Sequence, residues 1–320
     1  MKLNDAPGLD RKDLLGLEEL SEREIRLILD TAREFREVLD RPIKTVPAMR
    51  GFTIANLFYE SSTRTRMSFE LAQKRLTADS IGLAVTASSV KKGESLRDTA
   101  RNIEAMRVDM IVMRHSQSGA PHRLAAQIDA HVVNAGDGCH EHPTQGLLDL
   151  YTLLENLGDL RGKRIVIIGD IAHSRVARSN IHGLRRMGAQ VGVCGPPTLI
   201  PVGIEDLGVT VYPTIEEALA EADAINVLRI QLERIGVPLF PSTREYARLF
   251  GVTPARLEVA KREVLVLHPG PINRNVELDS RVADAPGAVI LSQVTNGVAI
   301  RMAVTYLLAQ KTMKAAHALA

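Results

Sequence analysis

Residues 58–70 read Phe-Tyr-Glu-Ser-Ser-Thr-Arg-Thr-Arg-Met-Ser-Phe-Glu, and the elements on either side of this stretch decide the fold. An apolar run typical of a β-strand, residues 52–59, leads into the cluster of hydroxyls and arginines. A helical pattern follows, because Met67, Leu71 and Leu76 recur on one helix face. We therefore predict a strand, a short polar turn and a helix in direct succession.

The turn between these two elements has the chemistry of an anion site. The first backbone N–H groups of a helix have no partner inside it and lie at the positive end of the helix dipole. Arg64 and Arg66 add positive charge, and a guanidinium group matches phosphate oxygens with two hydrogen bonds. An ordinary N-cap is the alternative. A cap needs one hydroxyl, however, and four are present: Ser61, Ser62, Thr63 and Thr65.

Composition narrows the class of protein. A chain of 320 residues suits two domains, and its 45% hydrophobic and 24% charged residues are typical of globular proteins. A net charge of +2 and the absence of Trp argue against nucleic acid as a partner. We expect no membrane segment and no signal peptide, since apolar runs are short and residues 1–11 are polar. Two cysteines, Cys139 and Cys194, favour the cytoplasm.

Strand-like runs alternate with helical patterns along the chain. The runs are residues 52–58, 81–85, 110–113 and 131–134, then 164–168, 190–193, 209–212, 224–228, 264–267 and a last one at 289–291. Predicted helices span 21–39, where Ser21 and Glu24 form a capping box, and 144–156, with a closing helix at 297–311. This alternation predicts an α/β fold with two domains, each a parallel sheet flanked by helices.

Polar clusters follow most of the predicted strands. They are residues 62–65, 114–115, 142–145, 175, 229–231 and 268–271. Ligands of parallel sheets bind beyond the carboxyl ends of the strands, so we expect these clusters to face one cleft between the two domains.

Two other site types fit parts of the sequence less well. Residues 139–142, Cys-His-Glu-His, contain zinc-ligand types, but four consecutive residues do not readily converge on one tetrahedral ion. A nucleophilic Cys139 would need a base and an activating environment. Residues 165–170, Ile-Val-Ile-Ile-Gly-Asp, resemble the start of a dinucleotide fold, yet the glycine fingerprint is missing, because residues 171–175 read Ile-Ala-His-Ser-Arg.

The motifs at residues 62–65, Ser-Thr-Arg-Thr, and 142–145, His-Pro-Thr-Gln, resemble the two signatures of the transcarbamoylases, the aspartate/ornithine carbamoyltransferase family. The resemblance covers almost the whole chain. It implies a carbamoyl-phosphate-binding domain at residues 1–145, an acceptor-binding domain at 146–296, and a C-terminal helix, 297–320, that returns to the first domain. It also implies that carbamoyl phosphate is bound by Ser62, Thr63, Arg64, Thr65, Arg114, His142 and Gln145, of which Arg64, Thr65, Arg114 and His142 are catalytic.

Further residues resemble the aspartate branch of the family. Residues 91–95, Lys-Lys-Gly-Glu-Ser, imply that Ser88 and Lys92 reach the active site of a neighbouring subunit in a homotrimer. The resemblance assigns aspartate to Lys92, Arg175, Arg229 and Gln231, with backbone contacts from Gly270 and Pro271. Gly270 stands where some aspartate enzymes have leucine, and glycine relaxes the backbone there. The Ser-Met-Gly motif of the ornithine branch is missing.

The resemblance therefore implies transfer of the carbamoyl group of carbamoyl phosphate to the amine of L-aspartate, in pyrimidine synthesis, with no metal and no cofactor. We expect Thr65, Arg114 and His142 to stabilise the oxyanion, and two loops, 87–95 and 231–244, to close over the ligands. Regulatory chains or a dihydroorotase are possible partners. The alternatives are ornithine or another acceptor, an NAD(P)-dependent oxidoreductase, and a non-catalytic scaffold that keeps the fold.

Overall fold

The computed structural model describes residues 8–83, 95–230, 239–260 and 263–319. The chain forms two compact units. Unit 1 comprises residues 1–147 and 295–320, and unit 2 comprises residues 148–294. The second crossing of the chain between the units is the reason that unit 1 contains both ends of the sequence. Each unit is described separately below.

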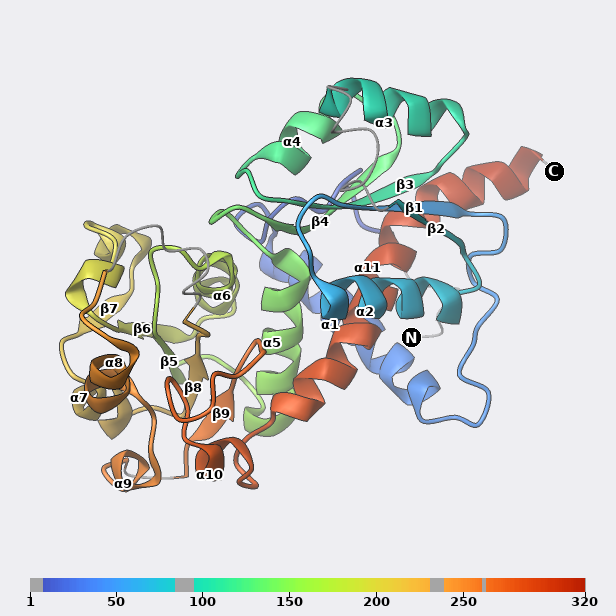
Figure 1. Cartoon of the computed structure of the whole chain (residues 1–320). Coiled ribbons are helices and arrows are strands. Elements are labelled where there is room, and N and C mark those ends of the chain that lie inside the picture. Colours follow the sequence, from blue (N-terminus) through green and yellow to red (C-terminus); the bar gives the residue numbers. More distant parts are fainter. Residues whose placement is uncertain (1–7, 84–94, 231–238, 261–262, 320) are drawn as a thin grey trace. The chain divides into compact units, whose positions relative to one another are not determined.

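Unit 1 is built on a four-stranded parallel sheet with strand order β2-β1-β3-β4. Its strands are β1 (Thr53–Phe58), β2 (Asp79–Leu83), β3 (Met110–His115) and β4 (His131–Asp137). Helices α1 (Glu22–Leu39) and α2 (Thr63–Arg75) lie on one face of this sheet, and α3 (Leu96–Ala105) and α4 (Ala120–Ala125) lie on the other (Figure 1). Apolar side chains of β1, β3 and β4 form a core with α3 and α4.

The capping box predicted for the first helix is confirmed. The Ser21 side chain accepts a hydrogen bond from the Glu24 backbone N–H, and the Glu24 carboxylate accepts one from the Ser21 N–H. The last helix, α11 (Ile290–Leu319), packs on α1, where the rings of Phe35 and Tyr306 meet edge to face at 5.6 Å. The predicted return of the C-terminal helix to the first domain is therefore correct.

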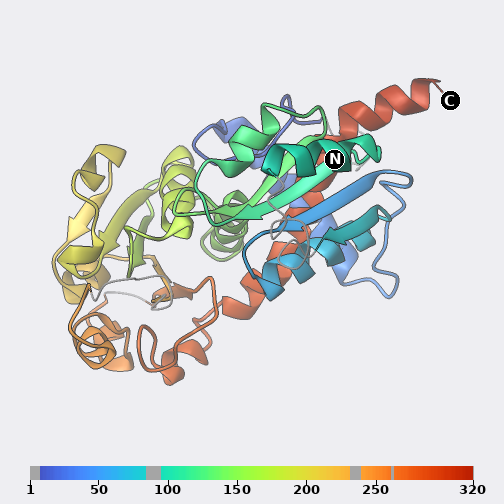
Figure 2. The ribbon, with the colours of Figure 1, turned by 45° about the horizontal axis from the view of Figure 1, so that its top comes forward.

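Unit 2 contains a five-stranded parallel sheet with strand order β7-β6-β5-β8-β9. Its strands are β5 (Arg164–Ile168), β6 (Gln190–Cys194), β7 (Thr210–Tyr212), β8 (Ala224–Val227) and β9 (Leu265–Leu267). Figure 2 shows α6 (Arg175–Arg186) and α7 (Ile215–Ala220) on opposite sides of this sheet. The other helices are α5 (Pro143–Leu157), which starts in unit 1, α8 (Thr243–Phe250), α9 (Pro254–Leu257) and α10 (Ser280–Ala283), with short 3-10 turns at Pro197–Leu199 and Ile204–Leu207.

Near the C-terminal end of the chain, two predicted boundaries are wrong. The strand expected at residues 289–291 is replaced by α11, which begins at Ile290. Among the described residues, pairing there is limited to one bridge, between Val266 and Ala288, and the Val289 carbonyl already accepts a helical hydrogen bond from Gln293 N at 3.0 Å. The closing helix is correspondingly longer than the predicted 297–311. Of the helices in the described part of the chain, none has the length and apolar character needed to cross a membrane.

Candidate active site

The start of α2 places the first predicted cluster at a helix N-terminus in unit 1. Ser62 is the N-cap, with φ −158° and ψ 88°, and within the described residues its side chain makes no capping hydrogen bond. Thr63 and Arg64 are exposed, whereas Ser62 and Thr65 are half-buried. The capping alternative therefore does not explain the Ser62 hydroxyl. The arrangement presents backbone N–H groups, hydroxyls and a guanidinium at one helix end, which suits an anion.

Arg114 lies inside strand β3, opposite the end of β1, the strand that precedes this helix. We expected it directly after a strand that ended at Met113. Instead, β3 continues to His115, because Arg114 pairs with Phe58 of β1 and its carbonyl accepts a hydrogen bond from Tyr59 N at 2.9 Å. The pairing of β3 with β4 shifts between Met113 and His115, an irregularity of the kind that redirects a side chain. The Arg114 guanidinium donates to the Ala135 carbonyl at 3.2 Å and lies 3.5 Å from Glu60 Oε1.

His142 and Gln145 lie at the start of α5, both largely buried at 4% and 9% exposed. The His142 carbonyl accepts hydrogen bonds from Gln145 N at 2.9 Å and Gly146 N at 3.1 Å, so His142 begins the helix directly before Pro143. His142 and Gln145 are thus placed three residues apart at the same helix end.

Two buried carboxylates fix the loop that carries His142, and the sequence interpretation assigned this role to neither of them. Asp137, fully buried, accepts hydrogen bonds from Gly119 N at 2.6 Å and Glu141 N at 3.1 Å. Glu141, 1% exposed, accepts from Leu17 N at 2.8 Å and Glu18 N at 3.1 Å. The only signal available in the sequence was the density of acidic residues around the His-Pro-Thr-Gln motif.

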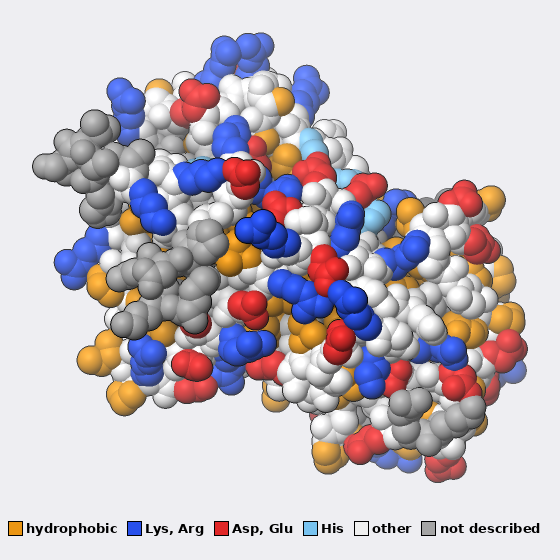
Figure 3. All heavy atoms as spheres, turned by 180° about the vertical axis from the view of Figure 1, so that it is seen from behind, with side chains coloured by type: hydrophobic (Ala, Val, Ile, Leu, Met, Phe, Trp, Pro, Cys, Tyr) orange, Lys and Arg blue, Asp and Glu red, His pale blue; other side chains and the backbone are white. Residues whose placement is uncertain are grey.

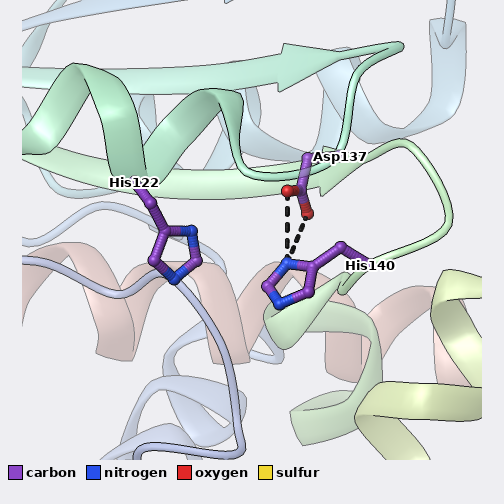
Figure 4. A group of neighbouring side chains, drawn as sticks. All are labelled: His122, Asp137 and His140. Carbon is purple, nitrogen blue, oxygen red and sulfur yellow. Dashed lines mark hydrogen bonds and ion pairs between the residues drawn. The ribbon is translucent and has the colours of Figure 1, made fainter.

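Figure 4 shows His122, Asp137 and His140, whose nitrogen and oxygen atoms lie within 4.8 Å of one another, close enough for a metal ion. The His140 Nδ1 atom is 3.2 Å from both Asp137 oxygens. This hydrogen bond to Asp137 raises the pKa of His140. Burial opposes the charge on Asp137, but its hydrogen bonds, from His140 first, hold its pKa below the usual value. Because both carboxylate oxygens already accept N–H bonds, the cluster acts as a hydrogen-bonded support for the loop. Of residues 139–142, considered above as zinc ligands, only His140 is a member of this cluster.

Unit 2 contains the residues predicted to bind the acceptor. Arg175 is the first residue of α6 and is 4% exposed, and Ser174 caps that helix by accepting from Ala177 N at 3.1 Å. Arg229 is half-buried and is the second residue after the end of β8. The residue between them is Leu228, whose N–H donates to the Ile168 carbonyl at 2.8 Å. Gly270 has φ +60°, a left-handed conformation that favours glycine.

Three predicted site residues, Ser88, Lys92 and Gln231, lie outside the described residues, as does most of the two loops expected to close. On the face seen in Figure 3, acidic and basic side chains are interspersed, in keeping with the small net charge. Interspersed charge of this kind does not form the continuous basic surface that nucleic acid requires.

Comparison with known proteins assigns the family. Residues 12–155 match the model described as "Aspartate/ornithine carbamoyltransferase, carbamoyl-P binding domain", and residues 161–308 match the "Asp/Orn binding domain" of the same family. The chain belongs to the aspartate/ornithine carbamoyltransferase family. The family's two domain models thus cover nearly all of the described sequence, in the order expected from the motifs.

Individual proteins of this family are similar to the chain in sequence and in structure. The chain is 63% identical over 298 residues to the aspartate carbamoyltransferase catalytic subunit of Gemmatimonas aurantiaca, covering 93% of each chain. The corresponding subunit of Moorella thermoacetica is 59% identical over 300 residues, covering 94% of this chain and 98% of that one. Aspartate transcarbamoylase from Trypanosoma cruzi, solved with carbamoyl phosphate and aspartate, is 30% identical with a TM-score of 0.83, over 95% of this chain and 98% of that one. Ornithine carbamoyltransferase from Pyrococcus furiosus is 27% identical with a TM-score of 0.83, over 94% and 97%.

Proposed function

We propose that the chain transfers the carbamoyl group of carbamoyl phosphate to the amine of L-aspartate, giving N-carbamoyl-L-aspartate and phosphate in pyrimidine (UMP) biosynthesis. The observation that carries the proposal is the start of α2, where Ser62 is an N-cap without a capping hydrogen bond among the described residues and Arg64 is exposed. This anion site accompanies 54–63% identity to catalytic subunits named aspartate carbamoyltransferase.

Binding of carbamoyl phosphate is proposed for unit 1. Hydroxyls, backbone N–H groups and Arg64 at the start of α2 suit the phosphate group, and Arg114 and His142 are positioned by β3 and by the start of α5. We assign this role to residues 1–145 with the helix at 297–320. The assigned ligand-binding residues are Ser62, Thr63, Arg64, Thr65, Arg114, His142 and Gln145, completed by Ser88 and Lys92 from a neighbouring subunit.

Binding of aspartate is proposed for residues 146–296. A dicarboxylate needs two cationic partners, and unit 2 has Arg175 at the start of α6 and Arg229 after β8. Lys92 and Gln231 complete the assigned set, with the backbone of Gly270 and Pro271. Ornithine, with its additional amine, would be repelled by two arginines, so aspartate is the better acceptor.

The proposed reaction needs no covalent enzyme intermediate. The aspartate amine attacks the carbamoyl carbon and forms the C–N bond, the C–O bond to the phosphate breaks, and the amine proton passes to the departing phosphate. Thr65, Arg114 and His142 donate hydrogen bonds to the oxyanion, while Arg64 neutralises the phosphate. Catalysis then depends on positioning and charge stabilisation.

A homotrimer is part of the proposal. Strand β2 lies at the edge of the first sheet, and it exposes Ile81 (46%) beside α2, which exposes Met67 (62%) and Leu71 (39%). Exposed apolar side chains around a sheet edge suit an interface between copies. Sedimentation should then give about three times the chain mass of 35.0 kDa. Cytoplasmic location is proposed from the two free cysteines, one of them buried.

The test is product formation from carbamoyl phosphate, with aspartate or ornithine as the acceptor and no added metal. Carbamoyl-aspartate alone supports the proposal, and citrulline alone overturns the acceptor assignment. Arg64→Ala should lose about 3 kcal/mol of transition-state stabilisation, or roughly 100-fold in kcat/KM, because one charge-stabilising donor is removed. Arg33→Ala, which removes an exposed arginine of α1, is the matched control and should leave kcat/KM unchanged. Near-normal turnover of Arg64→Ala would reduce the cluster to a helix end without catalytic function.

A further inference from the structure

A buried carboxylate in unit 2, Asp149 of α5, is the centre of a hydrogen-bond network. Asp149 is fully buried, and its Oδ2 atom accepts from Asn180 Nδ2 at 2.8 Å and Asn226 Nδ2 at 3.1 Å. Its Oδ1 atom accepts from Gln293 Nε2 at 2.8 Å. These partners belong to three elements: Asn180 to α6, Asn226 to β8 and Gln293 to the first turn of α11. One side chain therefore joins three segments that are distant in sequence.

The network continues to the loop at residues 268–271. The Gln293 Oε1 atom accepts from His268 N at 2.9 Å, and the His268 Nδ1 atom accepts from Gly270 N at 2.8 Å. Because Nδ1 accepts a hydrogen bond from an amide, the ring proton is on Nε2, which faces Glu277 Oε1 at 3.3 Å. Both side chains of the His268–Glu277 pair are fully buried. The backbone of Gly270 is thus held by a chain of hydrogen bonds that leads to Asp149.

The same network reaches the segment that carries Arg229. The Glu277 carboxylate also accepts from the Asn273 backbone N–H, and the Asn273 side chain donates to the Ile230 carbonyl at 3.0 Å. Ile230 directly follows Arg229. Asn180 lies on the helix that begins at Arg175. Every segment of unit 2 to which aspartate binding is assigned, as far as it is described, therefore connects to Asp149.

The direction of these hydrogen bonds is fixed by chemistry. The Asp149 carboxylate accepts only and the His268 N–H donates only, so the Gln293 amide must donate to the first and accept from the second. Asn180 is fixed likewise, since its Nδ2 atom also donates to the Val176 carbonyl at 3.0 Å. An amide at position 149 would place an NH₂ group against Gln293 or Asn180, and neither can turn over without losing its other bond.

We propose that Asp149 is a positioning residue for the acceptor, which holds the loop at Gly270 and the segments of Arg175 and Arg229 in the geometry that binds aspartate, without touching the substrate itself. This inference rests on the proposed function and adds a determinant of the acceptor site. Removing the carboxylate should weaken aspartate binding and leave carbamoyl phosphate binding in unit 1 intact.

The experiment uses the full-length chain with Asp149→Asn, the double variant Asp149→Asn/Gln293→Glu, and Asp206→Asn as a matched control at an exposed position of unit 2. In the double variant, the new amide at position 149 can donate to the new carboxylate at position 293, which still accepts from His268 N. Net charge is unchanged and each hydrogen bond keeps a donor and an acceptor. The KM for aspartate is measured at saturating carbamoyl phosphate, and the Kd of carbamoyl phosphate is measured by calorimetry.

For Asp149→Asn we expect the KM for aspartate to rise by at least about tenfold, with the Kd of carbamoyl phosphate changed less than about twofold. The double variant should recover most of the KM, and Asp206→Asn should match the wild type. An unchanged KM in Asp149→Asn overturns the inference, as does an equal loss of carbamoyl phosphate binding. If the single variant fails to fold, the double variant decides: a KM close to that of the wild type supports the inference, and a KM that stays raised, or a second failure to fold, overturns it. Failure of the proposed function is a separate result, because wild-type chain would then form no carbamoyl-aspartate.

Discussion

Replacing Glu141 with glutamine tests how the loop that carries His142 is held. The Glu141 carboxylate accepts hydrogen bonds from the backbone N–H groups of Leu17 and Glu18, at 2.8 and 3.1 Å. Glutamine has one acceptor oxygen, so its NH₂ group must face one of these two donors. Gly16 packs directly on the carboxylate, where an added Cβ would collide with Oε1, and this leaves little room for the amide to turn away.

The magnitude follows from two losses. A buried N–H left without an acceptor costs about 1–3 kcal/mol, and exchanging a charged acceptor for a neutral one at the other N–H costs about 1 kcal/mol more. The free energy of local opening should therefore fall by about 2–4 kcal/mol. Because each 1.4 kcal/mol is a factor of ten, the Leu17 and Glu18 amides should exchange hydrogen at least about 30-fold faster.

The assay is hydrogen exchange of the segments around residues 12–20 and 131–146, together with kcat. We expect kcat to fall with the loss of protection, since His142 directly follows the substituted residue. Glu37→Gln, at an exposed position of α1, is the control and should change neither quantity. Unchanged protection of the Leu17 and Glu18 amides in Glu141→Gln would refute the reasoning, whatever happened to activity.

Two further predictions concern unit 1. Hydrogen bonds to Glu24, from Arg11 and Ser21, outweigh its burial and lower its pKa to about 2, so its stabilisation is present above the unfolded pKa of 4.5 and is lost as the pH falls towards 2. Urea unfolding of Glu24→Gln should therefore show a deficit of at most about 3 kcal/mol at pH 7 that shrinks steadily below pH 4.5, and a deficit independent of pH would contradict this. Arg301→Met removes the hydrogen bonds to Ser68 Oγ and the Gly297 carbonyl, both 2.9 Å, and the contact over the Phe69 ring. It should destabilise α2 by about 1–3 kcal/mol and weaken carbamoyl phosphate binding by calorimetry, whereas an unchanged Kd would show that α11 does not support the anion site.

The sequence predicted those parts of the fold that depend on local pattern. The succession of β1, polar turn and α2 followed from an apolar run and a change to helical spacing, and the capping box at Ser21 and Glu24 needs only residues three apart. The apolar run at residues 289–291 was assigned to a strand because a short run does not distinguish strand from helix. Arg114 was placed outside its strand because the apolar run ends at Met113, and the pairing of Arg114 with Phe58 of β1 cannot be seen in one strand alone.

The supporting carboxylates escaped prediction for a different reason. Glu141 meets Leu17, which is 124 residues away, and Asp149 meets Gln293, which is 144 residues away. Partners so far apart leave no periodic pattern in the sequence, and the residue type alone does not show whether an acidic side chain is buried or exposed. What the sequence could provide was the family resemblance, which assigns residues that touch ligands and says nothing of the side chains that hold them.

Residues 137–149 contain the supporting carboxylates of both units. Asp137 and Glu141 accept backbone N–H bonds in unit 1, around the loop of His142, and Asp149 accepts amide N–H bonds in unit 2, around the segments of Arg175, Arg229 and Gly270. If each carboxylate acts through its own network, substitutions only eight residues apart should affect different kinetic parameters. Glu141→Gln should lower kcat with little change in the KM for aspartate, and Asp149→Asn should raise that KM first. A shared signature would mean instead that both act through a general loosening of α5, and the two networks would then be structural supports rather than separate determinants of catalysis and acceptor binding.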